Sequence, residues 1–174
     1  WEKDWTEGKP VDLPVAKLDA RRQTAAVLFP HGLMANSPSQ PLVDSTGGKF
    51  GPYAGQLLVG EMNKGRIMRV MLEKVAGKLQ GACVPFFGGK GLANGNNRLC
   101  FSPDGKTLWV GHSSHGWAGN RGIQTLTWTG KTPPDILRIS LTKTGFALTF
   151  TVPLDKESAG SSTSFTLKSY AYKY

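Results

Sequence analysis

One stretch of 21 residues, NNRLCFSPDGKTLWVGHSSHG at positions 96–116, constrains the fold of this chain more than any other. Residues 98–102 alternate as a half-buried strand does, the sequence Pro-Asp-Gly-Lys then reverses the chain, and residues 107–111 return as a second strand. Proline presets φ at the first corner, aspartate bonds to the backbone two residues on, and glycine tolerates the positive φ that closes the turn. The stretch therefore predicts a β-hairpin.

Similar strand and turn patterns extend along the chain, and 22 Gly and 11 Pro in 174 residues favour turns over long helices. An all-β chain with long Gly/Pro-rich loops is predicted. Residues 66–76 also contain good helix formers, but the flanking glycines and the preceding turn favour a strand there. The further strands are expected at 25–30, 41–44, 56–61, 66–72, 78–86, 123–129, 135–141, 146–152 and 164–174, with loops at 34–51, 87–95 and 153–162.

The N-terminal part differs from the rest. Residues 1–24 are charged and lack periodicity, which predicts an extended arm or linker before a single body at 25–174. The chain begins with Trp1, so we expect a piece of a longer parent protein. No apolar segment is long enough to span a membrane. The formal net charge is +9, but the basic residues are scattered, so no specific nucleic-acid binding is predicted.

The two cysteines and the histidines carry no metal-site signature. Cys83 and Cys100 are expected either as two buried thiols on strands or as a disulfide between neighbouring strands. His112 and His115 are three residues apart on an irregular loop with no third ligand beside them, so no metal site is predicted. The glycine-rich loop at 87–95 lacks the order of a phosphate-binding loop and is predicted to be a connection.

Several phrases together are similar to one family, the glucose/sorbosone dehydrogenase-like proteins. The sequence resembles the six-bladed β-propeller region of large extracytoplasmic bacterial members that are fused to a c-type cytochrome. The phrases that carry the resemblance are FPHG (29–32), GGKFGPYAGQLLVGE (47–61), RIMRVMLEKVAGKLQGACVPFF (66–87), NRLCFSPDGKTLWVG (97–111), HGW (115–117), LTWTGKTP (126–133), GFALTFTVPLD (145–155) and SYAYKY (169–174).

This resemblance implies antiparallel propeller blades, a partial propeller of roughly two to four, in a periplasmic or extracellular protein. It implies a sugar or alcohol dehydrogenase that uses pyrroloquinoline quinone and calcium and passes electrons to a cytochrome domain outside this chain. In the family a histidine base lies four residues before the Arg-Leu of the hairpin, which here is Asn94. Asparagine cannot act as a general base. His115 or His112 would have to replace it, with Arg98, Arg121 and Asn94 as quinone-binding residues.

The alternative is a non-catalytic propeller module that binds glycans or protein partners. Trp117 lies in a polar loop, and an aromatic ring there would stack on a sugar face. A third hypothesis is adhesion to acidic polymers through the net positive charge. A partial propeller also leaves strand edges unpaired, so a dimer or a covering arm is a further expectation.

Overall fold

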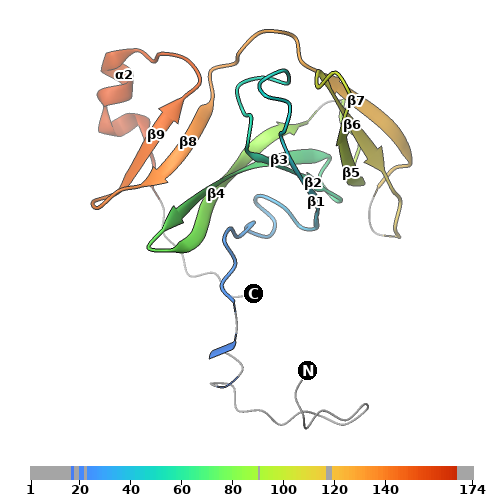
Figure 1. The fold of residues 1–174 in the computed structure, drawn as a ribbon, viewed down its shortest axis with the longest axis horizontal. Helices are drawn as coiled ribbons and strands as arrows, with labels where there is room; N and C mark the ends of the chain where they lie inside the picture. Colours follow the sequence, from blue (N-terminus) through green and yellow to red (C-terminus); the bar gives the residue numbers. More distant parts are fainter. Residues whose placement is uncertain (1–16, 18–19, 22, 90, 117–118, 168–174) are drawn as a thin grey trace.

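The structure is a computed structural model that describes residues 17, 20–21, 23–89, 91–116 and 119–167. These residues form three antiparallel sheets, so the predicted all-β class is confirmed. Figure 1 shows the first sheet in the middle, with the second on its right and the third on its left. The described part of the chain contains no helix that is long and apolar enough to cross a membrane.

The first sheet has four strands in sequential order. They are β1 (Pro38–Val43), β2 (Leu57–Glu61), β3 (Arg66–Val75) and β4 (Lys78–Gly88). The segment for which a helix was the alternative is strand β3, and its residues 67–71 are all buried. A two-residue turn leads into β4, with Ala76 at φ 47° and Gly77 at φ 82°, as tight hairpins require.

The second sheet contains β5 (Asn96–Phe101), β6 (Thr107–His112) and β7 (Gly122–Thr127). The predicted hairpin is confirmed as β5 and β6. Asp104 closes its turn by accepting hydrogen bonds from the Ser102 hydroxyl at 2.5 Å and from the Lys106 N–H at 3.0 Å. These bonds lower the pKa of Asp104, with the Ser102 hydroxyl as the main cause.

The third sheet is a hairpin of β8 (Ile136–Leu141) and β9 (Phe146–Phe150). It is followed by the short helix α2 (Lys156–Gly160) and the 3₁₀ helix η1 (Ser162–Ser164). Asp155 caps α2, because its carboxylate accepts the Ser158 N–H at 2.9 Å.

Two apolar clusters cover opposite faces of the first sheet. The larger lies between the first and second sheets, and its buried members are Phe50, Leu58, Ile67, Leu92, Leu99, Leu108 and Val110. The smaller is built from Ala35, Val59, Met68 and Val70. Where the two sheets meet, a Cβ on Gly60 would lie 2.6 Å from the Asn96 carbonyl, so only glycine allows β2 and β5 to approach so closely.

Several expectations were wrong. Residues 25–30 form no strand and none is fully buried, because Val27 and Phe29 pack on the smaller cluster from an irregular segment. The loop expected at 153–162 contains α2, and residues 164–167 form no strand. Residues 168–174 lie outside the described part, as does most of the predicted arm at 1–24.

The cysteines also differ from both alternatives that the sequence left open. Cys83 and Cys100 are free thiols, so no disulfide joins them. Cys83 on β4 is partly buried, and this burial raises the pKa of its thiol. Cys100 on β5 is exposed rather than buried, because its side chain points to the face of the second sheet opposite Leu99.

Candidate ligand-binding site

The structure brings together two of the residues predicted from the hairpin, His112 and Asn94. His112 ends β6, and its ring Nδ1 lies 3.2 Å from the Asn94 carbonyl oxygen. That carbonyl also accepts the Asn120 N–H at 3.4 Å. Nε2 of His112 is buried and has no hydrogen-bond partner among the described residues. The ring is therefore held at one nitrogen, and protein atoms cover the other.

The remaining predicted site residues do not converge on this histidine. Arg98 is exposed on β5 and donates to its own neighbour, Asn97, at the carbonyl oxygen (3.1 Å) and the side-chain oxygen (2.8 Å). His115 and Arg121 are exposed in the segment between β6 and β7. Trp117, the predicted sugar-stacking residue, lies outside the described residues.

Two of the positions implied as a site for pyrroloquinoline quinone, His112 and Arg98, already make contacts within the chain. A base must expose its free nitrogen to the ligand, and Nε2 of His112 is covered. Arg98, the predicted cation for the quinone carboxylates, is hydrogen-bonded to Asn97 instead. The described residues also contain no group of three His, Cys, Asp or Glu side chains placed to hold a metal ion.

A different set of polar residues, most of them buried, lies where the first and third sheets meet. Arg69 on β3 is fully buried, and its guanidinium pairs with the Asp135 carboxylate at 2.9 Å. The same guanidinium donates to the Gln56 side-chain oxygen at 2.6 Å and to the carbonyls of Ile136 (2.5 Å) and Leu137 (3.4 Å). We call Arg69, Gln56, Tyr53 and Asp135 the arginine network.

Tyr53 completes this network from the loop before β2. Its ring lies under the Arg69 guanidinium, with 4.0 Å between the guanidinium carbon and the ring centroid, and its hydroxyl donates to Asp135 at 2.7 Å. Burial raises the pKa of Tyr53 far above its ordinary value, and the bond to Asp135 adds to this shift. Tyr53 is therefore a neutral hydrogen-bond donor at every physiological pH.

An open cleft of about 590 Å³ adjoins the arginine network. Its walls come from the end of β4, from β7 and from the segment that leads to β8. Together with the loop before β2, which contributes Phe50 and Tyr53, they provide five aromatic rings, and Lys131 and Asp135 also line the cleft. The other three rings are those of Phe86, Phe87 and Trp128. Phe86 is held in place by Tyr53, edge to face at 5.7 Å between centroids, and by Phe50 at 6.1 Å. We call this cleft the aromatic cleft.

The indole of Trp128 packs closely against the backbone at Gly51. A Cβ on Gly51 would lie 2.9 Å from Cζ3 of the indole, and the φ of Gly51 is +108°, which side chains rarely adopt. The main-chain N–H of Trp128 donates to the Lys106 carbonyl at 3.1 Å, which ties the backbone at Trp128 to the hairpin turn of the second sheet.

Sequence reasoning did not single out these residues, although most of them stand inside the quoted phrases. Arg69 carried a signal, since a lone arginine between Met68 and Val70 on an apolar strand requires a buried partner. That partner, Asp135, is 66 residues away, and no local pattern identifies it. Searches of protein-family models, curated proteins and solved structures found no match for this chain.

Proposed function

We propose that this chain is a non-catalytic carbohydrate-binding module, a segment of an extracytoplasmic propeller of the glucose/sorbosone dehydrogenase-like kind. The observation that supports the proposal is the aromatic cleft, in which Phe87 (38% exposed) and the partly buried Trp128 line the same opening. Flat aromatic rings bind the apolar C–H faces of sugar rings, and nearby polar groups fix the sugar hydroxyls.

The polar groups of the cleft suit a neutral sugar. Asp135 already balances Arg69. Its Oδ2 accepts both Tyr53 and Arg69, whereas its Oδ1 accepts only the Ile136 N–H and retains acceptor capacity. Its side chain is 31% exposed, so solvent and ligands reach it. Lys131 adds donors at the rim. An anionic polymer would instead use the scattered surface cations, and such binding would weaken steeply with salt.

Binding of neutral oligosaccharides tests this proposal. We expect an array of neutral glycans to identify a ligand, and calorimetry to give roughly tenfold weaker binding for Phe87→Ala, equivalent to about 1.4 kcal/mol. Trp128→Ala should weaken binding at least as much, with circular dichroism to confirm folding, because Trp128 also packs on the larger cluster. Trp109→Ala is the matched control, since Trp109 is 47% exposed on β6 outside the cleft. Equal binding by all variants would contradict the proposal.

Sugar or alcohol oxidation is the competing function that the resemblance implies. With pyrroloquinoline quinone, calcium, aldoses and sugar alcohols added, we expect no dye reduction by this chain, because Nε2 of His112 is covered and Asn94 cannot replace it as a base. Turnover that is lost in His112→Gln and kept in His115→Gln would show that His112 becomes accessible, and it would overturn the non-catalytic assignment.

A further inference from the structure

The last hairpin leaves one edge of β9 without a neighbouring strand among the described residues, because the third sheet contains only β8 and β9. Unpaired edges present rows of free N–H and C=O groups and readily pair with another chain. Proteins usually protect such an edge with charges or proline. Residues 146–150, FALTF, contain neither.

The register shows which backbone groups are free. Two hydrogen bonds show which residues of β9 direct their backbone groups toward β8. The Thr142 N–H donates to the Gly145 carbonyl, and the Thr151 N–H donates to the Asp135 carbonyl. Ala147 and Thr149 therefore direct their N–H and C=O groups toward β8. Phe146, Leu148 and Phe150 direct theirs outward, to the open edge.

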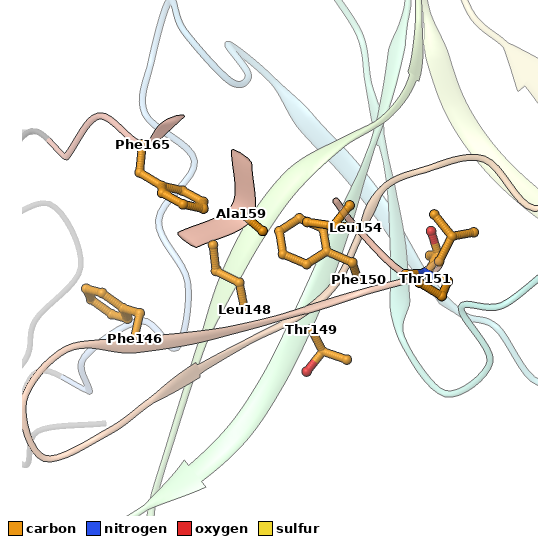
Figure 2. A pocket seen from close by; sticks show the side chains of 10 residues that line it. Phe146, Leu148, Thr149, Phe150, Thr151, Leu154, Ala159 and Phe165 are labelled. Carbon is orange, nitrogen blue, oxygen red and sulfur yellow. The ribbon is translucent and has the colours of Figure 1, made fainter. Parts of the chain in front are cut away.

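The side chains of those same three residues line an apolar groove of about 850 Å³. Figure 2 shows Phe146, Leu148 and Phe150 on the same side as Leu154, Ala159 and Phe165, whereas Thr149 points to the opposite side. Phe146 is 60% and Phe165 48% exposed. The free hydrogen-bonding groups and three of the apolar side chains thus belong to one strand.

We infer that this edge binds a second copy of the chain, with β9 paired antiparallel to β9 about a twofold axis at Leu148. This pairing sets Leu148 opposite Leu148 of the second copy and Phe146 opposite Phe150 of the second copy. Each outward residue then donates one N–H and accepts one. All six large side chains fall on the same face, so the two grooves join into one apolar surface.

The charges next to β9 favour pairing with a second copy of the chain. Copies with net charge +9 repel one another, but β9 itself is uncharged, so no like charges meet at the seam. Lys143 precedes the strand and Asp155 follows it. Antiparallel pairing brings the Lys143 end of one copy to the Asp155 end of the other, so charges of opposite sign flank the seam.

The edge strand β7 of the second sheet lacks these features. On β7, the exposed residues are Gly122, Ile123, Thr125 and Thr127, of which only Ile123 has a large apolar side chain. The Gln124 side chain is held by the loop between β4 and β5. It accepts the Ala93 N–H at 2.8 Å and donates to the Gly91 carbonyl at 2.7 Å. The β7 edge therefore provides a matched control.

Sedimentation equilibrium of the whole chain at several concentrations tests the pairing. We expect the mass to rise with concentration from 18.8 kDa towards twice that value. Leu148→Lys should keep the chain monomeric, because two lysines would lie opposite each other at the axis. Ile123→Lys, which alters a residue 67% exposed on β7, should leave the dimer intact. A monomer at every concentration, or a dimer unaffected by Leu148→Lys, would overturn the inference.

Amide hydrogen exchange distinguishes this edge from any other dimer contact. The N–H groups of Phe146, Leu148 and Phe150 should become protected as concentration rises, whereas those of Ala147 and Thr149 should be protected at all concentrations by β8. A concentration-dependent dimer in which the three outward N–H groups still exchange freely would place the contact elsewhere and overturn the pairing.

Discussion

Replacing Arg69 with methionine should lower the free energy of unfolding by about 3 kcal/mol, and the melting temperature by roughly 10 °C. Methionine fills much of the arginine's volume but makes none of its hydrogen bonds. Asp135, Gln56 and two main-chain carbonyls would lose their donor in a site where Arg69 is fully buried. Losing these buried hydrogen bonds lowers the free energy of unfolding far more than losing a typical surface ion pair does. Urea denaturation measures the change.

Arg138→Met is the matched control, because Arg138 lies exposed on β8 close to the same network. We expect it to change stability by no more than about 0.5 kcal/mol. Hydrogen exchange should localise the damage. Arg69 connects β3 to the start of the third sheet, so the amides of β8 and β9 should lose protection before those of β5 and β6. Equal destabilisation by both substitutions would show that the network does not hold the third sheet.

Turn chemistry explains why much of the fold could be predicted. The β5–β6 hairpin and the β2–β3–β4 meander are specified by residues a few positions apart, such as Asp104 and Gly105 in one turn and Gly77 in another. Residues 25–30 do not form the predicted strand, because an apolar run has the same sequence pattern whether it pairs in a sheet or packs irregularly on a cluster. Helix α2 was missed because it is only five residues long and has no buried face.

The candidate site was harder to predict, for a physical reason. Its parts come from the loop before β2, from β3, from the end of β4 and from the segment after β7, and only folding brings them together. Histidines and arginines in a sequence are taken as candidate site residues because their side chains can bind ligands or transfer protons. Here Arg98 is exposed and bonded to its neighbour, whereas the apolar-looking strand β3 contains the arginine that organises the site. Burial, which the sequence does not report directly, separates the two roles.

Glu61, at the end of β2, is a second buried charged residue. Its substitution should lower the free energy of unfolding about as much as substitution of Arg69. Its side chain is fully buried and accepts three main-chain N–H groups. One oxygen binds Asn36 at 3.0 Å and Ser37 at 2.8 Å, and the other binds Lys64. The carboxylate thus fastens the segment before β1 to the turn between β2 and β3.

Glu61→Gln keeps the shape of the side chain but turns one oxygen into an NH₂ group that must face an N–H. We expect a loss of about 3 kcal/mol of stability, because hydrogen bonds to a charged acceptor are each worth about 1.5–3 kcal/mol. Exchange of the Asn36 and Ser37 amides should accelerate most. Glu157→Gln on the exposed helix α2 provides the control and should change stability by no more than about 0.5 kcal/mol. If Glu61→Gln were equally mild, water would have to reach these amides in the folded protein, and the segment before β1 would be held by Val27, Phe29 and Met34 on the smaller cluster rather than by the carboxylate.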